Sequence, residues 1–251
     1  GGRHAAFTSV PTPTTAPAAT PPAMFAPAPT ATSAPVAAPV PVAAPAQQKP
    51  SCANPNALGV SRTVVIDTSG GPGFGFEHFK QLDFLTDKEV VLTFDDGPWP
   101  NNTAAVLKAL ADECTKAVFF AVGKHATYHP EILKQVLAAG HTVGTHTWSH
   151  VPLVNKKFSE DQRKEEIEKG ISAVKWALGG VSPAPFFRFP ALQHPPEMVK
   201  YLGTRNVGIF STDLDSFDFT MRKPEKVVRL RGDVSAHIER EYRAYLATLI
   251  F

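Results

Sequence analysis

The sequence predicts an α/β fold in which a parallel sheet, open or closed into a barrel, is covered by helices. Short apolar runs rich in β-branched and aromatic residues alternate about five times with segments of helical periodicity. Polar clusters follow most of these runs directly, and parallel barrels carry their chemistry at the carboxyl ends of the strands. Hydrophobic residues make up 43% of the chain, which permits a sizeable core.

The predicted strands are short, and turn-forming residues separate each one from the next helix. The run EVVLTF ends abruptly in Asp95-Asp96-Gly97-Pro98, whereas AVFFAV is typical of a fully buried strand. The segment GGPGFGF, residues 70–76, is predicted to be a turn-rich loop. Strands are predicted over residues 64–66, 89–94, 117–122, 142–145, 186–189 and 207–211.

The predicted helices have recognisable ends. Ser159 and Gln162 form a capping box ahead of the longest one, and two glycines terminate it. The side chains of Trp148 and Trp176 are expected in the core. Helices are predicted over residues 102–113, 130–140, 159–178 and 195–202, and Pro224 is expected to begin a last one.

Residues 1–50 differ in composition from the rest of the chain and are predicted to be a disordered Pro/Ala/Thr-rich linker. They hold 12 of the 24 prolines and 15 alanines but no Asp or Glu, and such sequences form extended spacers. The alternative is a proline-rich docking site for a partner. Residues 51–251 are predicted to form a single domain.

Charge and composition exclude several classes of protein. Residues 51–251 carry 23 basic and 23 acidic residues, so the domain lacks the basic surface that nucleic-acid binding requires. An apolar run of about 18 residues is absent, so no membrane span is predicted. No signal peptide is recognised, so we expect the chain to begin after processing or to be a fragment. We expect a secreted or cell-envelope protein, because long spacers of this kind are associated with such proteins. We also expect it to be a monomer.

Asp95 and Asp96 directly follow a predicted buried strand. Two adjacent carboxylates are costly there unless a cation neutralises them, because desolvation and mutual repulsion oppose their ionisation. The alternative interpretation is an ordinary turn in which an aspartate caps the next helix.

His146 and His150 follow the predicted strand over residues 142–145. Histidines four residues apart lie on one face of a helical turn, which is the spacing of a metal-ligand pair. With a carboxylate from another strand end they form a two-histidine, one-carboxylate set with open positions. The alternative is that backbone carbonyls satisfy both rings.

Further polar groups follow the last two predicted strands. Arg188 lies among three phenylalanines and needs a carboxylate partner, for which the Asp pair is the natural candidate. Asp213, Asp215 and Asp218 lie among apolar residues, which argues against a simple solvated run. The alternatives are an ordinary ion pair and a loop whose aspartates cap turns.

Four of these motifs together resemble one known family. TFDDG, HTWSH, RFP and DSFDF, which begin at residues 93, 146, 188 and 215, have the order and spacing found in polysaccharide deacetylases. This family is also called the NodB homology domain or carbohydrate esterase family 4. The resemblance extends from about residue 87 to residue 220. It implies a distorted (β/α) barrel with fewer than eight strands, of the seven-stranded type and incomplete at the C-terminus.

The resemblance implies roles for individual residues. Asp95 resembles the general base, Asp96 a metal ligand beside His146 and His150, and Arg188 the arginine that holds the base. The expected cofactor is a divalent cation, zinc in the first place, with cobalt or another ion as the alternative. The expected substrate is an acetylated glycan: chitin, peptidoglycan or another glycan.

The remaining implied roles concern the substrate and the second proton transfer. The Ala191 N–H resembles an oxyanion donor, and Asp218 resembles the aspartate that pairs with the catalytic acid. Phe219 stands where the family usually has Trp, and Trp99 is a candidate floor for a sugar subsite.

The family's last motif, a Leu-x-His strand, is not recognised in this chain. His237 is the only histidine after residue 218, but it lacks the preceding Leu and lies in the helix-like stretch HIEREYRAYL. Residues 229–251 are therefore atypical, and without a final strand the sheet would carry an open edge.

These observations give three functional hypotheses. The first is a metal-dependent N-deacetylase of glycans that contain N-acetylglucosamine. The second is a carbohydrate-binding relic with impaired catalysis, and the third is an amide or imide hydrolase that acts on a non-sugar substrate. A bridge between Cys52 and Cys114 is an open alternative to two free thiols.

Overall fold

The computed structural model describes residues 52–75, 77–79, 84–86, 89–216, 218–220 and, for the backbone alone, 245–250. These residues belong to one compact unit, Gln47–Phe251. The predicted linker over residues 1–50, the helix expected at Pro224 and the side chain of His237 lie outside the described residues.

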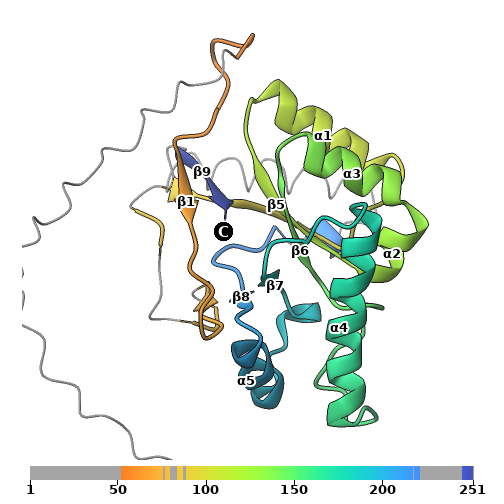
Figure 1. Cartoon of the computed structure of the whole chain (residues 1–251). Coiled ribbons are helices and arrows are strands. Elements are labelled where there is room, and N and C mark those ends of the chain that lie inside the picture. Colours follow the sequence, from red (N-terminus) through yellow and green to blue (C-terminus); the bar gives the residue numbers. More distant parts are fainter. Residues whose placement is uncertain are drawn as a thin grey trace, which may run out of the picture. The chain divides into compact units, whose positions relative to one another are not determined.

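A six-stranded parallel sheet forms the centre of this unit (Figure 1). Because all its strands run in one direction, their carboxyl ends meet at one edge, and the paired residues Asp95 and Phe120 mark that edge. The predicted parallel α/β sheet is therefore confirmed. In spatial order the strands are β2 (Gly73–Phe74), β8 (Gly208–Phe210), β7 (Phe186–Phe187), β6 (Thr142–Thr145), β5 (Ala117–Ala121) and β4 (Leu92–Asp95).

A second, three-stranded parallel sheet contains an element that the sequence analysis missed. Its order is β1 (Arg62–Val65), β9 (Tyr245–Ile250) and β3 (Glu89–Val90). Arg62 pairs with Ala247, and Glu89 pairs with Tyr245. The helix-like interpretation of residues 237–246 is therefore wrong for Tyr245 and the residue after it, since the apolar run YLATLI is long enough to pair with strands on both sides.

Helices cover one side of the main sheet, while β1 and β9 lie on the other (Figure 1). The capping box predicted at Ser159 is present and begins the longest helix. No helix among the described residues is both long and apolar enough to cross a membrane. The helices are α1 (Asn102–Asp112), α2 (Gly123–Tyr128), α3 (Pro130–Ala138), α4 (Glu160–Ala177) and α5 (Pro196–Thr204), with 3₁₀ turns η1 (Pro190–Leu192) and η2 (Asp218–Thr220).

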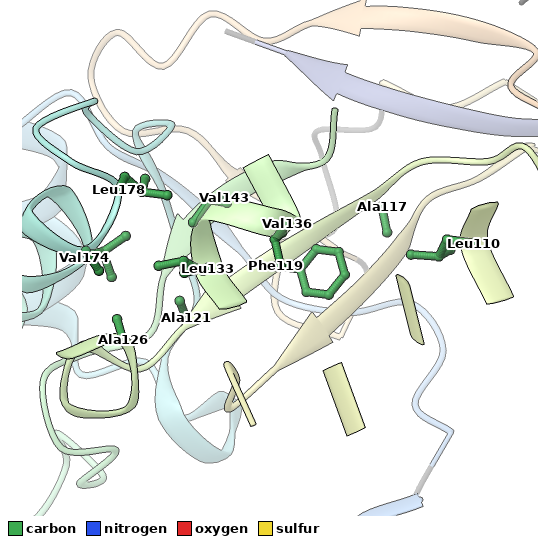
Figure 2. Close-up of a cluster of buried hydrophobic side chains, with 11 residues drawn as sticks. Leu110, Ala117, Phe119, Ala121, Ala126, Leu133, Val136, Val143, Val174 and Leu178 are labelled. Carbon is green, nitrogen blue, oxygen red and sulfur yellow. The ribbon is translucent and has the colours of Figure 1, made fainter. Parts of the chain in front are cut away.

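The largest hydrophobic cluster lies between the sheet and the helices α1, α3 and α4 (Figure 2). Phe119 of β5 and Val143 of β6 project from the sheet, and Leu133, Val136 and Val174 meet them from the helices. Burying side chains of this size stabilises the fold by roughly 1.5–3 kcal/mol each. This cluster fixes the helices against the strands whose ends carry the candidate site.

Three local predictions differ from the structure. The loop predicted over residues 70–76 contains β2, because Gly73 and Phe74 are buried and pair with β8. The strand predicted over residues 186–189 ends at Phe187. Trp176 was expected in the core but is 62% exposed, because it lies on the outer face of α4.

Cys52 and Cys114 form a disulfide, with their Cα atoms 5.9 Å apart. The bridge joins the first described residue to the turn that follows α1. The question that the sequence left open is therefore settled in favour of a bridge, a bond that is common in proteins of oxidising compartments.

Candidate metal and catalytic site

The candidate site lies at the carboxyl edge of the main sheet, where neighbouring strands deliver its side chains. Asp95 ends β4 and Asp96 follows it, while His146 directly follows β6 and Arg188 directly follows β7. The order β7-β6-β5-β4 explains why residues about 90 positions apart meet here.

Asp96, His146 and His150 converge as the sequence predicts. The Oδ1 atom of Asp96 lies 3.5 Å from Nε2 of His146 and 3.1 Å from Nε2 of His150. One potential ligand atom from each residue lies within 4.8 Å of the other two. His146 is almost fully buried, whereas Asp96 and His150 are partly open to solvent.

A hydrogen bond to the backbone orients the ring of His146. Nδ1 lies 2.6 Å from the carbonyl oxygen of Arg188, a distance that requires a proton on Nδ1. The other ring nitrogen, Nε2, faces the carboxylate of Asp96 at 3.5 Å. Either a proton on Nε2 or a cation between the two groups satisfies this contact.

The pKa values of the two partly open groups favour the forms that bind metal ions. The hydrogen bond with His146, followed by the nearby histidine charges, lowers the pKa of Asp96 despite its burial. Burial is the largest cause that lowers the pKa of His150, although Asp96 opposes it. At neutral pH the site thus holds an ionised carboxylate and a neutral imidazole.

The segment between the two histidines is not the helical turn that the sequence analysis expected. Thr147 and His150 have positive φ angles of 66° and 60°, so the chain forms an irregular loop. The two rings converge because the loop folds back, and the backbone N–H of His150 donates to Thr147 Oγ1.

Helix α4 holds this loop in place. The backbone N–H of Trp148 donates to the carbonyl of Glu166, and the N–H and hydroxyl of Ser149 donate to the carboxylate of the same residue. Gly170 packs directly against the backbone of Thr147.

Arg188 holds Asp95 in a network of hydrogen bonds. Its Nη1 atom lies 2.9 Å from Oδ1 of Asp95 and 2.7 Å from Oγ1 of Thr93. Nε donates to the carbonyl of Phe210 and Nη2 to that of Ser211. The guanidinium of Arg188 is nearly fully buried, whereas the carboxylate that it holds is about one-third exposed.

The two substrate-binding candidates near the strand ends lie in different settings. Ala191 is exposed in the turn η1 with a φ of 53°. Trp99 is 43% exposed, and its ring centroid lies 4.1 Å from that of His125. The Nδ1 atom of His125 is 2.6 Å from the carbonyl oxygen of Asp96, which connects this aromatic pair to the metal-ligand set.

The structure does not support the apolar setting predicted for the last acidic cluster. Asp213, Asp215 and Asp218 are all exposed, and Phe219 is 71% exposed. The carboxylate of Asp218 accepts a hydrogen bond from Ser216 at 2.7 Å. The cluster lies on a solvated turn because the residues after β8 leave the sheet.

Two residues of the site were missed by the sequence analysis. Thr93 precedes Asp95 by two positions on the same strand, so strand periodicity places both side chains on one face. His125 follows the buried strand β5 by four residues and was identifiable as another polar group after a strand end.

The donor set fits a divalent cation. Ligand atoms about 2.0–2.2 Å from a zinc ion lie about 3.3–3.6 Å apart at the edges of a tetrahedron. The two distances from Asp96, 3.1 and 3.5 Å, are close to that separation. One carboxylate and two imidazoles leave at least one position open, as hydrolytic sites require.

A parallel α/β sheet with two histidines and a carboxylate together at its carboxyl edge is an arrangement that also occurs in metal-dependent hydrolases. Comparison with known proteins identifies the family within that class. Residues 84–207 match the family model described as polysaccharide deacetylase. The resemblance to this family found in the sequence is therefore confirmed.

Individual relatives agree with this assignment. The chain is 34% identical over 131 residues to a peptidoglycan-N-acetylglucosamine deacetylase of Bacillus cereus, which covers 52% of this chain and 46% of the relative. It is 34% identical over 138 residues to chitin deacetylase 1 of Saccharomyces cerevisiae, covering 51% and 40%. Each match thus spans less than half of the curated relative.

A solved structure confirms the predicted barrel type. The peptidoglycan deacetylase Bd3279 of Bdellovibrio bacteriovorus superposes with a TM-score of 0.61 at 29% identity, over 78% of this chain and 52% of that chain. The fold shared with it is a curled, incomplete barrel of parallel strands covered by helices.

Proposed function

We propose that this protein is a divalent-metal-dependent hydrolase that removes acetyl groups from N-acetylglucosamine units of a glycan. The observation that carries the proposal is the convergence of Nε2 of His146 and Nε2 of His150 on one carboxylate oxygen of Asp96, at 3.5 and 3.1 Å. A divalent cation would stabilise such a cluster of potential ligand atoms. The family match and the deacetylases among the relatives supply the substrate class.

Asp96, His146 and His150 would hold the cation. When bound, a divalent ion lowers the pKa of an adjacent water and polarises an acyl oxygen. Asp95 acts as the general base, because Arg188 fixes its carboxylate beside the ligand set and leaves it accessible. The base removes a proton from the water that attacks the acetamide carbonyl.

The oxyanion and the departing amine each need a further group. Ala191 is an exposed residue at the same edge, and its backbone N–H would donate to the oxyanion, a contact that contributes roughly 3–4 kcal/mol. The sugar amine leaves with a proton that a general acid delivers. The products are acetate and a glucosamine unit.

A second candidate function is a glycan-binding protein with impaired turnover. It is favoured by the exposed setting of Asp218, whose described hydrogen bond is with Ser216 rather than with a histidine. We further propose that the protein works outside the reducing cytoplasm, since the Cys52–Cys114 bridge favours an oxidising compartment.

Acetate release tests the two functions directly. Purified protein, stripped of metal and reloaded with zinc or cobalt, is incubated with N-acetylglucosamine oligomers and separately with acetylated peptidoglycan. Metal-dependent acetate release from either substrate supports the deacetylase. Glycan binding without acetate release supports the impaired protein, and failure to bind a divalent ion contradicts the site itself.

A further inference from the structure

A histidine that the proposed mechanism does not use lies at the same edge of the sheet. His78 follows β2, the strand that pairs with β8, and it precedes the residues that match the family model. Its Nδ1 atom and Oγ of Ser211 lie 2.6 Å apart and share a hydrogen bond. His78 is exposed, whereas Ser211 is buried.

Ser211 in turn supports the arginine that holds the candidate base. Its carbonyl oxygen accepts a hydrogen bond from Nη2 of Arg188 at 2.8 Å, and the carbonyl of Phe210 accepts from Nε at 3.1 Å. The end of β8 therefore provides two of the acceptors that orient the guanidinium. A displacement of Ser211 would move its carbonyl oxygen away from Arg188. The hydrogen bond between Arg188 and Asp95 would then be less well oriented.

The segment after β2 is built to hold Ser211. The backbone N–H of Ser211 donates to Phe74 at 2.7 Å. Gly75 lies so close that a β-carbon on it would stand 2.7 Å from the carbonyl carbon of Ser211, and its φ of 100° is also one that side chains rarely adopt. The bond from His78 adds a side-chain contact to this backbone packing.

The ring of His78 is itself held by its neighbours. Its centroid lies 3.9 Å from that of His194, which also packs edge-on against Phe79 and Phe189. Burial, and next the proximity of His78, lowers the pKa of His194 to about 4, so His194 stays neutral near pH 7. A neutral ring packs against His78 without placing a second charge near the guanidinium of Arg188.

We propose that His78 is a positioning residue of the catalytic site: through Ser211 it fixes the carbonyl that holds the Arg188 guanidinium on Asp95. The inference rests on the proposed function in one respect, the role of Asp95 as general base. The contacts that carry it come from a segment outside the family match.

Steady-state kinetics of three variants test the proposal. His78→Ala is expected to lower kcat about 10-fold, within the range for groups that orient a catalytic residue from outside, with KM and bound metal unchanged. His78→Asn keeps a polar atom near the position of Nδ1 and should restore most of kcat. Glu77→Ala, an exposed neighbour, is the matched control and should retain full activity. A wild-type kcat for His78→Ala, or equal losses for the Ala and Asn variants, would overturn the proposal.

A second measurement decides the proposal if the wild-type protein releases no acetate. The Nε–H of Arg188 is hydrogen-bonded and buried, so its NMR signal should exchange slowly with solvent. The signal is assigned by its loss in Arg188→Lys. Exchange about 10-fold faster in His78→Ala, but not in His78→Asn or Glu77→Ala, supports the positioning role. Unchanged exchange in His78→Ala overturns it, whatever the fate of the deacetylase proposal.

Discussion

Gly170 of α4 lies so close to Thr147 that a β-carbon on Gly170 would stand 2.6 Å from the carbonyl carbon of Thr147. Thr147 separates His146 from the rest of the loop that also contains His150. The long outer helix therefore packs directly on the backbone that positions both candidate histidine ligands. Through this contact Gly170 influences the site, although it takes no part in the chemistry.

Gly170→Ala should destabilise the protein and disturb metal binding. In an exposed helix position the change would stabilise by about 1 kcal/mol, because alanine is the better helix former. Here the new methyl group meets backbone atoms, so we expect a net loss of about 1–3 kcal/mol, as in other overpacked sites. Urea unfolding and zinc titration measure both effects. Ser172→Ala, an exposed position of the same helix, is the control, and a stabilised Gly170→Ala protein would contradict the packing argument.

His146→Ala should abolish metal binding and activity together. It removes one of three ligand atoms that lie within 4.8 Å of one another, and we expect affinity to fall by more than the roughly 10–100-fold typical of outer groups. Metal content after dialysis and circular dichroism separate lost binding from lost folding. His129→Ala changes a histidine outside the site and should bind normally. Full metal occupancy in His146→Ala would refute the ligand assignment.

Asp95→Asn should keep the metal but lose at least about 100-fold in turnover, the usual contribution of a general base. The amide keeps the shape of the side chain and an oxygen for the hydrogen bond from Arg188, so folding should be unaffected. Acetate release per bound metal ion is the measurement. Near-normal rates would remove Asp95 from the proposed mechanism.

Arg188→Lys should lower turnover by about 10–100-fold at unchanged metal content. The guanidinium holds Thr93, Asp95 and two carbonyls at once, and an ammonium group with three donors cannot satisfy four acceptors in that geometry. Thr93→Val, which removes one of these acceptors, should cause a smaller loss. Equal activity of the lysine variant would show that Asp95 needs no positioning.

The sequence predicted the parts of the site that lie at the ends of strands. Periodicity located the apolar runs, and parallel topology then brought Asp96, His146 and Arg188 to one edge. The prediction from sequence failed where the chain leaves regular structure, because the loop at Thr147 depends on positive φ angles and on contacts with α4. The spacing of the two histidines predicted that their rings converge, as they do, but the segment between them is a loop and not the expected helical turn.

Long-range strand pairing was the other source of error. β2 is only two residues long and lies in a glycine-rich segment, so no periodicity could reveal it; its partner β8 defines it. β9 lies between β1 and β3, which precede it by more than 150 residues. The hydrogen bond between His78 and Ser211 depends on the pairing of β2 with β8, so the sequence alone could not reveal it.

Two histidines, the buried His141 and the half-buried His194, should make the protein less stable in acid. Burial lowers the pKa of His141 and of His194 to about 4. Above about pH 6.5 both rings are neutral in the folded and the unfolded chain and contribute nothing. Between about pH 6.5 and 4 the unfolded chain binds protons that the folded protein excludes, so stability falls as the pH falls, by at most about 1.4 kcal/mol per pH unit for each ring.

The change at His141 can be isolated. His141 accepts a hydrogen bond from the backbone N–H of Ala117, and asparagine offers an oxygen for the same bond without titrating in this range. Urea unfolding at several pH values should therefore show a shallower loss of stability in His141→Asn than in the wild-type protein. Because His194 still titrates, the slope should decrease without disappearing. An unchanged slope would mean that the unfolded chain and the folded protein bind the proton at His141 equally well.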